Sequence, residues 1–192
     1  MLVLFGVPAF IESWKSTQKD ADDFKKYTSI CDKGYMYGCA YLGMLYHQGR
    51  GAKQDYQKAI ELYVRACNGG NMAGCTNLGT LYEGGEGLKQ DYQKAANLYR
   101  KACDRGSMTG CYNLGYMYNT GNGLTQDYQK AIKLYAKACD GGNMSGCTNL
   151  GVLYYKGQGV KQNTKRAIEL THKACVGGDK GGCYNDYALK KR

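Results

Sequence analysis

The sequence is poor in the residues that mark several common classes of protein. Its 192 residues include one proline, one tryptophan and only two histidines. The histidines, His47 and His172, stand far apart in the chain, so the clustered histidines of a metallo-enzyme are missing. The longest apolar run, MLVLFGVPAF, is shorter than the roughly 20 apolar residues that cross a membrane. We therefore predict no metal, no cofactor and no membrane span.

Cysteine and glycine are abundant by contrast, and the cysteines follow a strict pattern. The chain has 10 cysteines and 28 glycines. Segments of the form C-x7-C recur every 36 residues without insertion, and they start at Cys31, Cys67, Cys103, Cys139 and Cys175. A fixed period of this length is typical of a solenoid or another array of repeats. Many short helices joined by tight turns fit this composition better than one large core.

Each repeat contains two segments with helical periodicity. The first, as in CTNLGTLYEGG (75–85), places Cys75, Leu78 and Leu81 at steps of three. A loop of the form G-x-G-Φ-x-Q-[DN] leads to the second, as in DYQKAIELYVRAC (55–67), where Asp55 is a natural N-cap and Ala59 begins an apolar face. We name these segments helix A and helix B. The unit is therefore helix, loop, helix and tight turn.

These motifs resemble those of a known repeat family. The string L-G-x-[LM]-Y occurs at 42–46, 78–82, 114–118 and 150–154, each time followed by two alanines seven positions apart. The pattern looks like a tetratricopeptide-type unit with a lengthened loop, and G-x-G-Φ loops mark the SEL-one-like repeat (SLR). With C-x7-C in each unit, residues 20–192 closely resemble the Helicobacter cysteine-rich protein family, secreted proteins described as β-lactamases. The resemblance implies an all-α fold, a right-handed α-solenoid of helix-turn-helix repeats.

The cysteine spacing favours local disulfides. Equivalent cysteines of adjacent repeats stand about 8 to 10 Å apart, as packed helix axes do, whereas a disulfide tolerates about 7 Å between Cα atoms. The partners within one C-x7-C segment lie instead at the end of helix B and the start of the next helix A. We therefore predict one disulfide per repeat, with the pairs Cys31–Cys39, Cys67–Cys75, Cys103–Cys111, Cys139–Cys147 and Cys175–Cys183.

Other interpretations of the cysteines fit less well. Zinc sites usually have C-x2-4-C spacing and often histidine ligands, and a thiol nucleophile needs a free cysteine near a base. Reduced core cysteines in a cytosolic repeat protein would not need so regular a pairing. Disulfides persist in oxidising compartments, so we predict a secreted or periplasmic protein.

The two ends of the chain differ from the repeats. Residues 1–14 have the length of a signal-peptide hydrophobic region but lack basic residues before it, and we favour a leader remnant over a segment packed on the first repeat. A disulfide-stapled solenoid of about five repeats is expected over 20–192. Near the end, Asp186 and Lys190 replace the leucine and tyrosine of other repeats, which predicts a polar, frayed edge.

The charge of +10 comes from 26 basic and 16 acidic residues. The lysines alternate with acidic residues on helix B and in the loops, and the chain has no basic run and no recognisable nucleic-acid module. A solvated outer face is the favoured interpretation, with no nucleic-acid partner. Adhesion to acidic surfaces, as in a host-interacting surface protein, is the alternative.

A candidate ligand-binding face follows from the resemblance, because helix A lines the concave groove of tetratricopeptide-like arrays. Asparagine recurs just before L-G, and an asparagine amide both donates and accepts hydrogen bonds. Such a ladder can pair with the backbone of an extended peptide, while tyrosines supply contact area. We predict a peptide or protein ligand, peptidoglycan-derived or otherwise, held by Asn77, Asn113, Asn149, Asn185, Tyr112 and Tyr116. The alternative is that the asparagines serve helix–helix contacts.

Catalysis is weakly supported by the residues. A serine β-lactamase needs S-x-x-K, usually with S-D-N and K-T-G. S-x-x-K occurs once, from Ser16 to Lys19, ahead of the first repeat, and the other two motifs are absent. β-Lactam hydrolysis or penicillin binding is therefore implied by the family resemblance alone, and we assign no catalytic residue.

Overall fold

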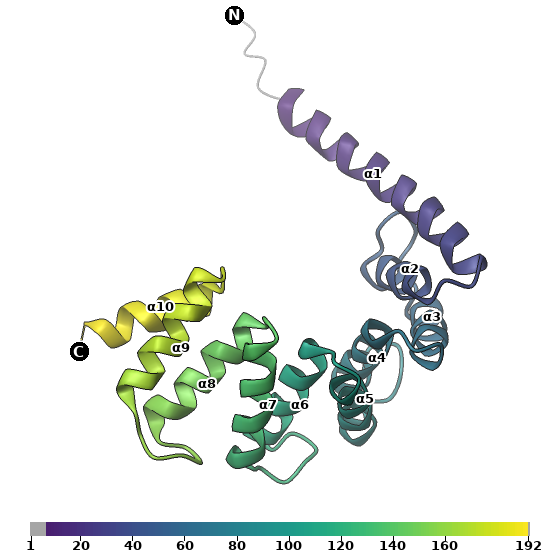
Figure 1. Cartoon of the computed structure of the whole chain (residues 1–192). Coiled ribbons are helices and arrows are strands. Elements are labelled where there is room, and N and C mark those ends of the chain that lie inside the picture. The colour runs from purple at the N-terminus through teal and green to yellow at the C-terminus, as the bar shows by residue number, and fades with distance from the viewer. Residues whose placement is uncertain (1–6, 192) are drawn as a thin grey trace, which may run out of the picture. The chain divides into compact units, whose positions relative to one another are not determined.

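The structure, a computed structural model, describes residues 7–191, and their side chains from residue 18 onward. Within that range the chain forms ten α-helices and no strand (Figure 1). The chain divides into two compact units, residues 1–89 and 90–192. The first unit contains α1 (Val7–Asp32), α2 (Met36–Gln48), α3 (Tyr56–Asn68) and α4 (Met72–Gly84). The second contains α5 (Tyr92–Asp104), α6 (Met108–Thr120), α7 (Tyr128–Asp140), α8 (Met144–Lys156), α9 (Thr164–Val176) and α10 (Lys180–Lys190).

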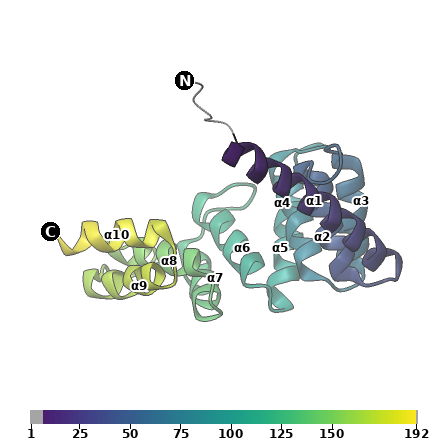
Figure 2. The same cartoon turned by 90° about the horizontal axis from the view of Figure 1, so that it is seen from above.

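The predicted alternation of helices is confirmed. The even-numbered helices are the A helices of the repeats, and α3, α5, α7 and α9 are the B helices. Within the second unit, successive helices from α5 to α10 pack in antiparallel pairs, which Figure 2 shows from above. The all-α fold of helix-pair repeats with one disulfide per repeat is thus confirmed. The right-handed sense of the superhelix stays a prediction.

The first helix takes the place of a B helix ahead of the first cysteine pair. Residues 1–6 of the expected leader lie outside the described residues, and from Val7 the chain belongs to α1. The C-terminal half of α1 packs on α2, where the rings of Phe24 and Tyr46 meet edge to face at 5.1 Å. Arg50 also donates to the Asp20 carboxylate at 2.7 Å. None of the described helices is long and apolar enough to span a membrane.

Short-range signals fix the helix ends. The predicted N-caps of the B helices are formed: the Asp127 carboxylate, for example, accepts from the Lys130 backbone N–H at 2.9 Å. The turn from B to A needs a residue of positive φ, which Gly142 supplies at 91°. Asn143 then caps α8 by accepting from the Gly146 N–H at 3.0 Å. The same turn recurs at each repeat boundary.

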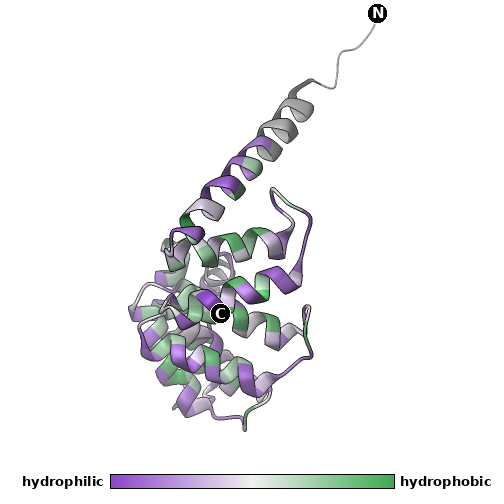
Figure 3. Ribbon diagram, turned by 90° about the vertical axis from the view of Figure 1, so that its right-hand side faces the viewer, coloured by the Kyte–Doolittle hydropathy of each residue, from purple (hydrophilic) through white to green (hydrophobic). Residues whose placement is uncertain are grey.

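The core lies where the A and B helices face one another, as in the buried cluster of α7, α8 and α9. Figure 3 shows that hydrophobic and hydrophilic residues alternate along the helices. Large buried side chains recur at the repeat step, among them Tyr63, Tyr99 and Tyr135, each 0% exposed. The glycine of L-G allows the close approach of helix A: a Cβ on Gly115 would stand 3.0 Å from the Tyr135 ring. The α2–α3 and α6–α7 pairs therefore each close over one tyrosine.

The disulfides join the cysteines in the predicted pairs. Each links the last turn of a B-position helix to the first turn of the next A helix, with Cα atoms 4.3 to 4.6 Å apart. The internal half-cystines are buried, and all ten cysteines are bonded. Each bridge thus fixes the turn between successive repeats.

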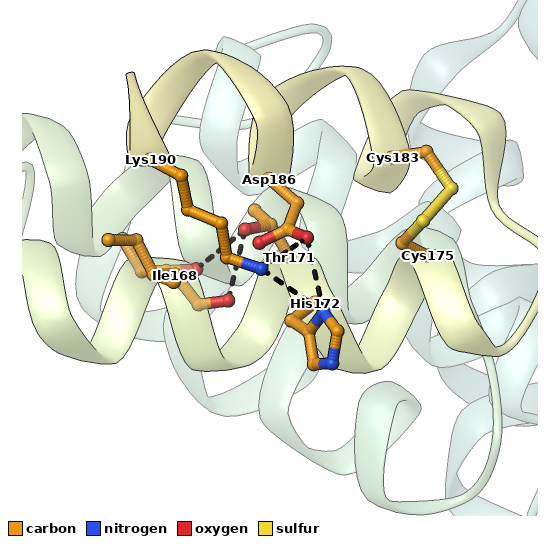
Figure 4. Close-up of polar contacts among 8 residues, drawn as sticks. Ile168, Thr171, His172, Cys175, Cys183, Asp186 and Lys190 are labelled. Atoms are coloured by element: carbon orange, nitrogen blue, oxygen red, sulfur yellow. Dashed lines mark hydrogen bonds and ion pairs between the residues drawn. A yellow bond between two sulfur atoms is a disulfide. The ribbon is translucent and has the colours of Figure 1, made fainter. Parts of the chain in front are cut away.

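The expectation of a frayed C-terminal edge is wrong. Helix α10 continues through Lys190, and Asp186 is only 8% exposed. The Asp186 carboxylate accepts from the Lys190 ammonium at 2.8 Å and lies 3.1 Å from Nδ1 of His172 on α9 (Figure 4). These contacts replace the apolar packing of the earlier repeats, so the edge is polar but ordered as a helix.

Candidate ligand-binding face

The predicted asparagines all lie on A helices and are half-buried. Asn77 is on α4 in the first unit, and Asn113, Asn149 and Asn185 are on α6, α8 and α10 in the second. The sequence left open whether these amides face a ligand or serve helix–helix contacts. Half-burial lies between these two cases, because the amides are neither fully exposed nor enclosed between helices. Their surroundings decide how much hydrogen-bonding capacity is left for a ligand.

Asn149 is surrounded by tyrosines of the preceding helices. The Tyr112 ring on α6 lies 5.9 Å from the Tyr135 ring on α7, measured between centroids. Burial raises the pKa of the Tyr112 phenol, and the Asn149 amide beside it opposes this shift without cancelling it. Tyr116, four residues further along α6, is 40% exposed. The structure thus brings Tyr112, Tyr116 and Asn149 together on one face of the second unit.

The buried Tyr135 hydroxyl is part of the same arrangement. Burial raises its pKa well above the ordinary value, and the Asn149 amide opposes the shift. The amide does not reach hydrogen-bonding geometry, so within the described residues the Tyr135 hydroxyl has no hydrogen-bond partner. In the first unit, Asn77 stands in the same relation to the buried Tyr63 hydroxyl, which also lacks a partner there.

The sequence analysis did not place the tyrosines of helix B beside the asparagines. Their full burial fits a packing role in the core. The available signal was a constant spacing of 14 residues, from Tyr63 to Asn77 and from Tyr135 to Asn149. Asn77 and Asn149 therefore each lie beside a buried phenol of the preceding B helix and also reach the surface.

A cavity of about 290 Å³ opens at the last repeat of the second unit. It lies among α8, α9 and α10, and Asn185 forms part of its wall. The complete lining is Val152, Tyr155, Lys156, Thr171, Asn185, Ala188 and Leu189. Asn185, the last of the predicted asparagines, thus lies at this cavity.

Ser145 donates to a carboxylate, but this contact does not form an acylating centre. Ser145 donates to Asp179 at 2.8 Å, and this carboxylate also accepts from the Gly182 N–H at 2.8 Å. Burial raises the pKa of Asp179, but the hydrogen bonds from Gly182 and Ser145 outweigh it and hold the pKa below its usual value. Asp179 therefore acts as the N-cap of α10. The Ser16 side chain of S-x-x-K lies outside the described side chains.

The part of the chain that the structure describes also contains no cluster of potential metal ligands. No group of three or more His, Cys, Asp or Glu residues is placed there to hold an ion. His172 instead pairs with Asp186, and Lys190 completes the contact (Figure 4). This cluster orders the end of α10.

The fold and the disulfides define the class of the protein as an α-solenoid of helix-pair repeats stapled by one disulfide each. The family model of the Sel1 repeat matches residues 37–71, 73–107, 109–143 and 145–179, which is more than half of the chain. The chain therefore belongs to the Sel1 repeat family. Repeats of this family usually mediate protein interactions.

Solved structures show the same fold. Cysteine-rich protein B (HcpB) of Helicobacter pylori is 36% identical, with a TM-score of 0.55 over 68% of this chain and 94% of that protein. A protective antigen of uropathogenic Escherichia coli, c5321, is 31% identical with a TM-score of 0.77 over 85% of this chain, which spans only 35% of the antigen. A Sel1 repeat protein of Oxalobacter formigenes, 22% identical, matches with a TM-score of 0.77 over 90% of this chain and 78% of that protein. No match is found among curated protein sequences.

Proposed function

We propose that this protein binds an extended peptide along the A-helix face of its repeats, as an exported interaction module. The observation that carries the proposal is the grouping of Asn149 with Tyr112 and Tyr116 on one face of the second unit. An amide that is half-buried among rings is held in place before a ligand arrives, so little conformational entropy is lost on binding.

The chemistry of the face fits a peptide backbone. An asparagine amide can donate to a peptide carbonyl and accept from a peptide N–H at the same time. Asparagines recur at the repeat step along α6, α8 and α10, so a chain that runs across the helices meets the same group at each repeat. Exposed ring area at Tyr116 adds apolar contact at small entropic cost.

The test is selection of decapeptides by display on the oxidised protein, followed by affinity measurement with two variants. We expect the double variant Asn113→Ala/Asn149→Ala to bind about 30-fold more weakly, because each lost hydrogen bond costs about 1 kcal/mol. Asn122→Ala is the matched control, since Asn122 is an exposed loop asparagine of the same unit. Equal affinities of the double variant and the control would contradict the proposed face.

The exported location is supported by the five disulfides, which an oxidising compartment maintains. Fractionation of the source cells, with the protein found only in the cytosol, would overturn this part of the proposal. Adhesion through the basic surface would instead give binding that falls steeply with added salt.

Hydrolysis of penicillin or cephalosporin derivatives remains the enzymatic alternative that the family resemblance implies. Nitrocefin turnover by the purified protein tests it directly. Turnover that one point substitution abolishes, without loss of folding, would favour an enzyme over a peptide-binding module.

A further inference from the structure

The loops between the A and B helices hold neighbouring repeats together through the second glycine of their G-x-G motif. In the second unit, the side-chain amide of Gln93 on α5 donates to the Gly123 carbonyl in the loop between α6 and α7. A Cβ on Gly123 would overlap the Tyr92 side chain, so the loop lies directly against the start of α5. The same hydrogen bond recurs in the other loops, from Gln57 to Gly87 and from Gln129 to Gly159.

The residue between the two glycines distinguishes the loop of Gly123 from the others. In three of the loops this residue contacts the preceding repeat or α1: Arg50 with Asp20, Glu86 with His47, and Gln158 with Tyr128. The equivalent residue in the fourth loop is Asn122, which is exposed. Within the described chain, the Asn122 side chain has no hydrogen-bond partner. Its carboxamide is therefore free to react.

An asparagine that precedes a glycine can react with its own backbone. The nitrogen of Gly123 attacks the carboxamide carbon of Asn122, a C–N bond forms, and the amide nitrogen leaves as ammonia with the proton of the attacking N–H. The product is a five-membered succinimide. Water then opens the ring at either carbonyl and gives aspartate or isoaspartate. The reaction needs only water, and glycine favours it because no Cβ hinders the attack.

The two Asn-Gly pairs of the sequence differ in the state of the attacking nitrogen. Asn68 is the last residue of α3, and the Gly69 N–H donates to the Arg65 carbonyl at 3.0 Å. The Gly123 N–H has no hydrogen-bond partner in the described chain. Both asparagines are exposed, so the backbone and not the access of water distinguishes them. The fold thus protects Asn68 and leaves Asn122 open to attack.

We propose that Asn122–Gly123 is a self-modification site of the folded protein, and that isoaspartate at this position releases the loop from α5. In isoaspartate the main chain passes through the former side chain, which inserts one more carbon before Gly123. Gly123 already lies against Tyr92 without room for a Cβ, and its carbonyl must stay in place to accept from Gln93. The longer backbone displaces this carbonyl, so the hydrogen bond between the two repeats is lost.

Mass spectrometry of peptides from aged protein tests the site. The oxidised protein is incubated at mildly alkaline pH, and the loss of amide is followed at Asn122 and Asn68. We expect the loss at Asn122 to be several-fold faster in the folded protein. After reduction and denaturation the two rates should converge, because both pairs are Asn-Gly. Loss at Asn68 that matches or exceeds that at Asn122 in the folded protein would overturn the site.

NMR of the glutamine side chains tests the release. The isoaspartate form is separated by chromatography, and we expect the Gln93 side-chain NH₂ signals to move to the positions of a solvated amide. Gln129 is the matched control, because its partner Gly159 follows Gln158 and the loop cannot react in this way. Unmoved Gln93 signals, or aspartate as the sole product, would overturn the release.

Two variants separate the causes. Asn122→Gln keeps an amide, places the residue of the next repeat in the loop, and should show no ageing at this site and no change at Gln93. Asn122→Asp adds the charge without lengthening the backbone, so it should leave the Gln93 signals in place. A displacement of Gln93 by Asn122→Asp as large as that caused by isoaspartate would overturn the backbone explanation.

Discussion

Removal of single disulfides tests how the staples stabilise the repeats, and two pairs in the second unit form a matched comparison. Both Cys103–Cys111 and Cys175–Cys183 have a sequence separation of 8. The chain-entropy model therefore gives the same loss for either pair, about 2.5 kcal/mol of the free energy of unfolding.

Burial distinguishes the two pairs. Cys103 and Cys111 are 2% and 0% exposed, whereas Cys175 and Cys183 at the edge are half-buried. Replacing an internal pair by alanines also removes two buried sulfur atoms, each comparable to a methylene group worth about 0.8 kcal/mol. We expect a loss of about 4 kcal/mol for Cys103→Ala/Cys111→Ala and about 2.5 kcal/mol for Cys175→Ala/Cys183→Ala.

Guanidinium unfolding under non-oxidising and non-reducing conditions, followed by far-UV circular dichroism, measures both losses. Hydrogen exchange at the B-to-A turns shows whether each loss stays within its own repeat, as nearest-neighbour coupling in repeat arrays predicts. Equal losses would mean that chain entropy alone acts. Wild-type midpoints in both variants would refute the idea that the bridges stabilise this fold.

Substitutions at three further positions give independent checks. Tyr135→Phe removes a buried hydroxyl without a hydrogen-bond partner in the described chain, so thermal unfolding should show no loss of stability, whereas Tyr135→Ala should cost about 3 to 5 kcal/mol. Asn143→Ala removes the N-cap of α8 and should cost about 1 kcal/mol in denaturant unfolding, while Asn143→Asp keeps the cap. Burial raises the pKa of Asp186, but contacts with Lys190 and His172 outweigh it and lower the pKa, so its stabilisation holds above about pH 4 and is lost on acidification below it. Asp186→Asn should flatten that part of the pH–stability curve, and an unchanged acid slope would exclude Asp186 as its source.

The fold was predictable because its determinants are local and repeated. The cysteine step fixed the period, the caps such as Asp127 fixed the starts of the B helices, and the positive-φ glycines fixed the turns. Each unit of 36 residues meets nearly the same neighbours, so one correct assignment serves all repeats. Helix α10 was less predictable, because Asp186 is ordered by His172 and Lys190, a contact that no repeat pattern indicates.

The sequence predicted which asparagines share a helix face but not how deeply they are buried. The spacing placed the asparagines on one helix face, whereas their half-burial depends on tyrosines of the preceding helices. The cavity borders a position where the repeats differ, ELTHKAC in place of ELYVRAC, with Thr171 where a tyrosine is expected. A change of one side chain shows its effect only when the surrounding helices are in place.

Core and face positions of the repeats obey different constraints. The tyrosine of helix B is 0% exposed and is retained in α3, α5 and α7, because the same helices close over it each time. Positions on the A face vary, with Thr80, Tyr116 and Val152 one repeat apart, since no neighbouring helix fixes them. Thr171 is a core position that varies, yet its side chain is 0% exposed and its hydroxyl donates to the Ala167 carbonyl at 3.0 Å. A core position can therefore keep its packing through a large change of side chain, provided that the neighbouring helices adjust to the new volume.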